Sequence, residues 1–164
     1  MQSYTHIIHD LAPVYDASSS VLILGSLPSV SSRGQFFYQH PRNRFWPVIA
    51  CLTGESVPRT TEEKRALLLR HHIALWDVIG ECDIIGSSDS SIRNVLPNDI
   101  RLILEAAPIR KIFVNGKTAD RYYRKHLLPL TGREAICLPS TSPANAAWSE
   151  KRLCEAWSAA LKDC

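Results

Sequence analysis

Two segments in the first third of the chain combine residue types that can do chemistry together. The first, Gly25-Ser26-Leu27-Pro28-Ser29, directly follows an apolar run at residues 21–24. Gly25 lets a ligand come close to the backbone, and Pro28 fixes the turn and removes one donor. The backbone N–H groups near Ser26 and Leu27 can then bind a carbonyl oxygen or a developing anion. Gly25, Ser26 and Leu27 are therefore candidate ligand-binding residues.

The second segment joins aromatic residues to polar and basic ones, from Phe36-Phe37-Tyr38 to His40-Pro41-Arg42-Asn43-Arg44-Phe45-Trp46. The aromatic triplet offers flat surfaces on which a nucleic-acid base can stack, and such stacking contributes about 1–3 kcal/mol per base. For these residues alone, a strand-to-loop turn followed by aromatic side chains packed on the core is the simpler interpretation.

Together the two segments resemble the first motif of the mismatch-specific uracil-DNA and thymine-DNA glycosylases, a branch of the uracil-DNA glycosylase superfamily. In that branch a Gly-x-Asn-Pro-Gly turn is followed, about a dozen residues later, by a His-Pro-x-Asn-Arg-Phe-Trp type sequence, which residues 40–46 match in order. The resemblance implies an enzyme that flips a base out of DNA. It also implies that Tyr38 stacks on this base, and that His40 and the backbone of residues 25–27 bind it.

One residue of the turn departs from the family pattern. The catalytic Asn of the family, which positions the attacking water, falls on Leu27, and a leucine cannot polarise water. The Gly-Ser-Leu-Pro-Ser turn resembles the hypoxanthine-DNA glycosylase branch, which also lacks that Asn. Asn43 is the nearest amide, so we predict that Asn43 is catalytic and orients water at C1′. Capping of a helix that Arg44 opens is an alternative role, compatible with the first.

A further candidate segment lies near the end of the chain, in the loop Leu138-Pro139-Ser140-Thr141-Ser142-Pro143-Ala144-Asn145-Ala146. Its hydroxyl and backbone donors suit phosphates, and a helix start at Ala146 would favour an anion. It resembles the second motif of the superfamily, a loop that enters the minor groove, although an ordinary loop and helix cap is the simpler alternative. The predicted DNA-binding residues are Ser140, Thr141, Ser142, Pro143, Ala144, Asn145 and Lys117.

Two further segments resemble parts of related enzymes. Asn115-Gly116-Lys117 is similar to a Phe-Asn-Gly-Lys segment of thymine-DNA glycosylases, and we interpret it as mainly structural, with Lys117 reaching a phosphate. The polar run at residues 86–94 resembles a Gly-Ser-x-Asp segment of the hypoxanthine branch. It lines the base pocket in one interpretation and is a surface loop in the other.

Short apolar runs and helix-like stretches alternate along the chain. The runs at residues 21–24, 73–76, 111–114 and 135–138 suit buried strands. The stretches at 60–69, 97–104, 118–127 and 146–161 suit helices, the first capped by Thr60. This alternation predicts an α/β fold, a three-layer α/β/α sandwich around a mostly parallel four-stranded sheet, in one domain over residues 1–164. Ligands bind beyond the carboxyl ends of such strands, where both candidate segments begin.

Composition excludes several classes of protein. Apolar residues make up 45% of the chain and charged residues 21%, with a net charge of +3, which is ordinary for a globular protein. We expect neither a membrane span nor a secretion signal. The five cysteines lack metal-binding spacing, so we expect reduced thiols in a cytoplasmic protein, with no cofactor, no metal and no iron–sulfur cluster. They are Cys51, Cys82, Cys137, Cys154 and Cys164.

These inferences converge on a monofunctional DNA glycosylase of base-excision repair. It would act as a monomer on double-stranded DNA and hydrolyse the glycosidic bond of hypoxanthine, uracil or both. No lysine is placed to suggest a Schiff base, and no acidic residue immediately follows Gly25. The main alternative is an inert or weak DNA-binding module on the same scaffold. A Rossmann-like nucleotide binder is disfavoured because the turn is not glycine-rich.

Overall fold

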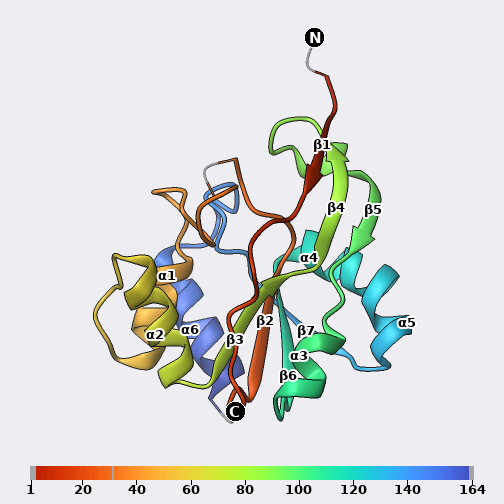
Figure 1. Ribbon diagram of the computed structural model, residues 1–164. Helices are drawn as coiled ribbons and strands as arrows, with labels where there is room; N and C mark the ends of the chain where they lie inside the picture. Colours follow the sequence, from red (N-terminus) through yellow and green to blue (C-terminus); the bar gives the residue numbers. More distant parts are fainter. Residues whose placement is uncertain (1–2, 31, 163–164) are drawn as a thin grey trace.

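The computed structural model describes residues 3–30 and 32–162. At its centre lies a four-stranded sheet with the order β3-β2-β6-β7, in which every pairing is parallel (Figure 1). The strands are β2 (Val21–Gly25), β3 (Ile73–Asp77), β6 (Lys111–Asn115) and β7 (Ala135–Leu138). All four apolar runs are therefore strands, and the predicted fold class is confirmed.

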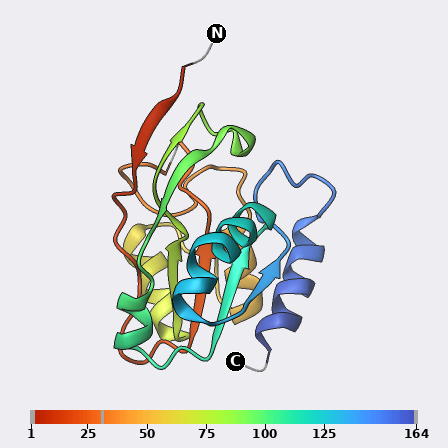
Figure 2. The same ribbon diagram turned by 90° about the vertical axis from the view of Figure 1, so that its right-hand side faces the viewer.

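Helices cover both faces of this sheet, as the two perpendicular views show (Figures 1 and 2). One face carries α1 (Phe45–Thr53), α2 (Thr61–Arg70) and α6 (Glu150–Leu161). The other carries α3 (Arg101–Ala106), α4 (Lys117–Tyr122), a π-helical turn (Tyr123–Leu127) and α5 (Leu128–Thr131). Among the described residues, no helix has the length and apolar character needed to cross a bilayer.

The sheet separates two hydrophobic cores because successive strand residues point to opposite faces. In β2, Ile23 packs in the core that contains Phe45 and Trp157. Leu22 and Leu24 pack in the core on the other face. Burial on both faces explains why β2 is an uninterrupted apolar run.

A second, antiparallel sheet was not predicted. It has the order β1-β4-β5 and is formed by β1 (Thr5–Ile8), β4 (Ile79–Ile84) and β5 (Arg93–Pro97). Only Val78 separates β3 from β4, so the chain passes directly from one sheet into the other. The new strands are partly exposed and polar, with register shifts in the β4–β5 pairing, and their sequences therefore lack a clear alternating pattern.

The helix starts were predicted with mixed success. Thr60 caps α2 as expected, since its hydroxyl oxygen accepts a hydrogen bond from the Glu63 N–H at 3.1 Å. The predicted helix start at Ala146 is wrong. The helix α6 begins at Glu150, and its cap is Ser149, whose hydroxyl oxygen accepts from the Arg152 N–H at 3.1 Å. The loop after β7 therefore has no helix N-terminus at Ala146 to attract an anion.

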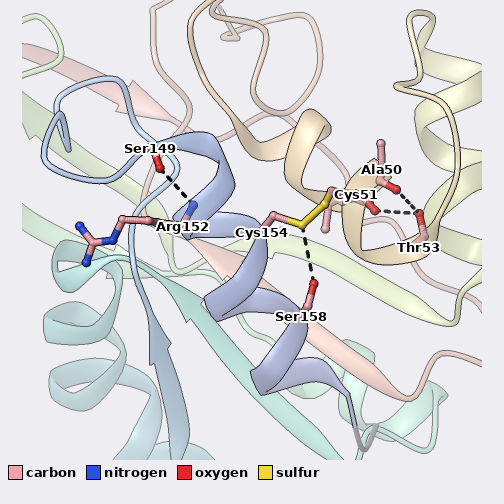
Figure 3. The surroundings of a disulfide bond; sticks show 8 residues. Ala50, Cys51, Thr53, Ser149, Arg152, Cys154 and Ser158 are labelled. Atoms are coloured by element: carbon pink, nitrogen blue, oxygen red, sulfur yellow. Dashed lines mark hydrogen bonds between the residues drawn. A yellow bond between two sulfur atoms is a disulfide. The ribbon is translucent and has the colours of Figure 1, made fainter.

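The expectation of reduced thiols is also wrong for two cysteines. Cys51 of α1 and Cys154 of α6 form a disulfide (Figure 3). They are 103 positions apart in the sequence, and only the packing of α1 against α6 brings their Cα atoms to 6.2 Å. Cys82 is a buried free thiol and Cys137 an exposed one, while Cys164 lies outside the described residues.

This disulfide is expected to stabilise the fold. Closing a loop of 103 positions restricts the unfolded chain, and such cross-links contribute about 2–4 kcal/mol. Reduction should lower the free energy of unfolding in urea by that amount. The double variant Cys51→Ser/Cys154→Ser is the control, because its stability should not respond to reductant. A wild-type unfolding midpoint that is the same with and without reductant would contradict the prediction.

Candidate active site

A cleft of about 920 Å³ opens at the carboxyl edge of the parallel sheet. Its walls come from segments that are far apart in the sequence. They are the turn after β2, the residues Phe37, Tyr38 and Asn43, the end of β3 at Asp77, the start of α4, and the loop after β7. This is the position where ligands bind in parallel α/β sheets.

Most residues predicted for the site lie in this cleft. His40 and Pro143 do not line it, and the His40 Nδ1 instead accepts a hydrogen bond from the Arg42 N–H at 3.1 Å. The predicted residues that line the cleft are Gly25, Ser26, Leu27, Tyr38, Asn43, Lys117, Ser140, Thr141, Ser142, Ala144 and Asn145. Their roles stay predictions.

The turn after β2 presents free backbone donors. The Gly25 carbonyl accepts from the Val78 N–H at 2.7 Å, and the Ser26 carbonyl accepts from the Ile79 N–H at 3.0 Å. These bonds fix the turn through its carbonyl groups. Within the part of the chain that the structure describes, the N–H groups of Ser26 and Leu27 make no hydrogen bond. Free N–H groups of this kind can bind an anionic or carbonyl oxygen.

Tyr38 is held from two sides. Its ring stacks on Phe45 with 4.1 Å between centroids and 18° between planes. Its hydroxyl oxygen accepts from the Asn115 Nδ2 at 3.2 Å, and its backbone has a φ of 56°, which is uncommon for a residue other than glycine. Burial raises the pKa of the Tyr38 hydroxyl, so the ring stays neutral. A rigid, neutral ring at the cleft is suited to stacking on a base.

Asn115 has a part in the site that the sequence analysis missed. Besides binding Tyr38, its Nδ2 donates to the Thr141 hydroxyl oxygen at 3.0 Å, and its Oδ1 accepts from the Thr141 N–H at 3.1 Å. One side chain at the end of β6 thus joins the aromatic residue to the loop after β7. The sequence analysis noted the resemblance of Asn115-Gly116-Lys117 to a segment of thymine-DNA glycosylases but interpreted it as mainly structural.

Asn43 lies beside both the cleft and the start of α1. Its Oδ1 accepts from the Phe45 N–H at 2.9 Å, so it bonds the first residue of α1 from the position before Arg44, which is the N-cap residue. The residue also lines the cleft, and its Nδ2 makes no hydrogen bond to any described residue. Because an amide oxygen has two lone pairs, Oδ1 can accept from a water while it caps the helix.

The polar run at residues 86–94 contributes one rim of the cleft, through Ser87 and Asp89. Asp89 Oδ2 accepts from the Thr118 hydroxyl at 3.1 Å, which joins this rim to α4. From the other side, the Arg33 guanidinium donates to the Gly86 carbonyl at 3.1 Å. The second sheet thus carries a polar loop to the site.

Arg44 holds the loop after β7 in place. Its guanidinium donates to the backbone carbonyl groups of four residues of that loop, and its own N–H donates to the Thr141 carbonyl at 3.1 Å. The four carbonyl groups belong to Thr141 at 3.4 Å, Ser142 at 2.8 Å, Asn145 at 3.1 Å, and Trp148. The rigid fork of an arginine suits this arrangement.

Replacing Arg44 should loosen the loop. In Arg44→Ala the loop carbonyl groups lose a charged donor, and such bonds contribute about 1.5–3 kcal/mol each. We expect the free energy of unfolding to fall by about 3 kcal/mol, because water replaces part of the lost bonding. The control is Arg42→Ala, since Arg42 is exposed and its side chain makes no hydrogen bond to the described residues. Equal unfolding midpoints for the two variants would contradict this role.

Comparisons with known proteins agree with this architecture. Residues 12–163 match the family model described as "Uracil DNA glycosylase superfamily". The chain belongs to this superfamily. The prediction made from the two halves of the first motif is thereby confirmed, and with it the prediction of a DNA glycosylase.

Relatives within the superfamily align over most of the chain. A "Hypoxanthine DNA glycosylase" of Methanosarcina acetivorans is 39% identical over 152 residues, which cover 91% of this chain and 94% of that protein. One of Methanosarcina barkeri is 34% identical over 153 residues, covering 92% and 95%. A solution NMR structure of a Methanosarcina acetivorans protein, 38% identical, superposes with a TM-score of 0.78 and covers 92% of this chain and 94% of that chain.

Proposed function

We propose that this superfamily member excises hypoxanthine from DNA. The proposal rests on one observation, that the free Ser26 and Leu27 N–H groups and the Tyr38 ring lie in the same cleft. A base flipped into the cleft would stack on the ring, and the N–H groups would stabilise the base anion as it departs. Two relatives that carry the name hypoxanthine DNA glycosylase support this choice of base.

In this proposal Asn43 takes the place of the missing motif-one Asn. Its amide would hold a water against C1′, while its Oδ1 keeps the cap on Phe45. Leu27 contributes only its backbone. An ionised leaving group reduces the need for a general base, which is consistent with an amide as the water-orienting group.

In this proposal the enzyme acts as a monomer on a DNA duplex. The loop after β7 would contact the DNA backbone. Two hydrogen bonds already form within the loop: the Ser142 N–H donates to the Ser140 hydroxyl oxygen, and the Ala144 N–H donates to the Ser142 hydroxyl oxygen. Both hydroxyl groups still have a hydrogen to donate to a phosphate. Lys117 follows Gly116, which packs against Ser140 of this loop, and it would add a positive charge for the same phosphates.

The decisive experiment uses purified protein and duplexes that carry a single hypoxanthine, uracil or mismatched thymine. We expect alkali-labile abasic sites from the hypoxanthine duplex. Tight binding without any base release would instead support an inert DNA-binding module. Uracil release would widen the substrate range.

A second measurement tests the monofunctional mechanism. Lys117 lines the cleft, so borohydride should be added during turnover to trap any Schiff base. We expect no covalent protein–DNA adduct. If an adduct forms with the wild type but not with Lys117→Ala, the enzyme uses attack by lysine instead of direct hydrolysis.

The proposal also includes a cytoplasmic location, which fractionation of cells that produce the protein would test.

A further inference from the structure

Arg33 is a basic residue of the cleft that the proposed function does not use. It follows the turn after β2, lines the cleft and is partly buried. Its Nε donates to the Pro28 carbonyl at 3.3 Å, and its Nη2 donates to the Gly86 carbonyl at 3.1 Å. One guanidinium thus joins the turn after β2 to the loop between β4 and β5.

The charge of this guanidinium has no counter-ion within the part of the chain that the structure describes. Both of its hydrogen-bond partners are neutral carbonyl groups, and none of the ion pairs includes it. The ionisable side chain that influences it is the Cys82 thiol, and burial raises the pKa of that thiol, which keeps it neutral. Burial lowers the pKa of the Arg33 guanidinium, yet an arginine stays protonated in proteins. A partly buried charge without an opposite charge is costly, and an anionic ligand would remove that cost.

Part of the guanidinium is free to bind such a ligand. The Arg33 Nη1 makes no hydrogen bond to any residue that the structure describes. The backbone that carries it is fixed, because the Arg33 N–H donates to the Ser29 carbonyl at 3.1 Å. The adjacent Ser32 is also held, since its hydroxyl oxygen accepts from the Gln39 N–H at 2.9 Å. The free donors are therefore in place before a ligand arrives, which lowers the entropic cost of binding.

We propose that Arg33 binds a phosphate group beside the flipped nucleotide. A nucleotide whose base enters the cleft brings its flanking phosphates to the walls of the cleft, where Arg33 lies. A planar guanidinium suits phosphate oxygens because it can donate parallel hydrogen bonds to them. This contact adds to those proposed for Lys117 and the loop after β7. It lies on the wall formed by the turn after β2 and the loop between β4 and β5, and it does not depend on which base is excised.

Two variants separate the charge of Arg33 from its bonds to the carbonyl groups. Arg33→Gln keeps N–H donors for Pro28 and Gly86 but removes the positive charge. Arg33→Lys keeps the charge but loses the rigid fork that holds the two carbonyl groups together. Phosphate binding depends on the charge, whereas a purely structural role depends on the carbonyl bonds.

The test measures binding to a duplex that carries a tetrahydrofuran abasic analogue, which has phosphates but no base to excise. In Arg33→Gln the affinity should fall about 10- to 100-fold, as expected for the loss of a hydrogen bond to a charged group. The plot of log affinity against log salt concentration should become shallower by about 0.9, since one phosphate contact is lost. Arg33→Lys should keep the wild-type slope.

Arg59→Gln is the matched control, because it removes the same charge from an exposed residue outside the cleft. Its affinity and its salt slope should stay near those of the wild type. An equal change of slope in Arg59→Gln would show an effect of net charge and overturn the inference. Weaker binding by Arg33→Gln with an unchanged slope would also overturn it, because only a structural role would then remain.

A second measurement locates the phosphate. Neutral methylphosphonates replace, one at a time, the phosphates that flank the abasic analogue. Wild-type protein should lose about tenfold in affinity at one of these positions, and Arg33→Gln should lose nothing more there. Wild-type affinity that is insensitive at every flanking position would overturn the inference even if Arg33→Gln does not fold.

The rate of hypoxanthine excision at saturating protein distinguishes phosphate from base. If Arg33 binds a phosphate, Arg33→Gln should excise at nearly the wild-type rate once the DNA is fully bound. Normal binding of the abasic duplex with slow excision would mean that Arg33 acts on the base instead. Because the binding experiments contain no base, wild-type protein that releases no hypoxanthine would refute the proposed function and leave this inference standing.

Discussion

Gly25→Ala is expected to abolish most of the excision activity while leaving the protein folded. A Cβ atom at this position would lie 2.4 Å from the Asp77 Oδ1 and 2.6 Å from the Tyr38 hydroxyl oxygen, far inside van der Waals contact. Both side chains are held by other bonds, to His9 and Asn115, so neither can move freely. Displacing reacting groups by about 1 Å costs about 100-fold in rate.

The measurement is single-turnover excision of hypoxanthine together with thermal unfolding. Gly54→Ala is the matched control, because Gly54 has a φ of 72° with open space around it and lies at the end of α1. That variant should lose stability through backbone strain yet keep its excision rate. If Gly25→Ala retains wild-type activity, excision does not depend on the close approach of Gly25, Tyr38 and Asp77.

Asn43→Ala is expected to slow excision by about 100- to 1000-fold, the range seen when one positioned polar group is removed from an active site. It should also lower the free energy of unfolding by about 1 kcal/mol, since the cap on Phe45 is lost. Measuring the rate and the stability of this variant alone would not separate the two roles.

Asn43→Ser separates them. A serine hydroxyl can also accept a hydrogen bond from the N–H two residues ahead, so stability should stay near that of the wild type. Its shorter side chain has no amide to hold a water, so the excision rate should remain as low as in Asn43→Ala. Full activity in Asn43→Ser would mean that Asn43 only caps α1 and that another group orients the water.

The central sheet could be predicted because its signals are local. The strand β2 is apolar on both faces, and Thr60 marks the start of α2 through a bond to a residue three positions away. Partly exposed strands such as β1 leave no comparable pattern. The predicted helix start at Ala146 was wrong because Ser149, and not a residue near Ala146, caps α6.

The candidate site divides in the same way. The match at residues 40–46 identified the superfamily, and the substitution of Leu27 directed attention to Asn43. The sequence could not show that Arg44 would bind carbonyl groups about 100 positions away, nor that Asn115 would join Tyr38 to Thr141.

The sequence by itself thus determined the superfamily, the parallel sheet and the edge of that sheet at which the cleft lies. These depend on residue order, on periodicity and on the rule that parallel strands end together. Only the tertiary structure decided which distant residues meet. Cys51 bonds to Cys154 because α1 packs on α6. His9 meets Asp77 because its own N–H is bonded to Gly80 of β4, three residues beyond Asp77 at the end of β3. Such pairs have no spacing rule, since packing and not sequence separation brings their atoms together.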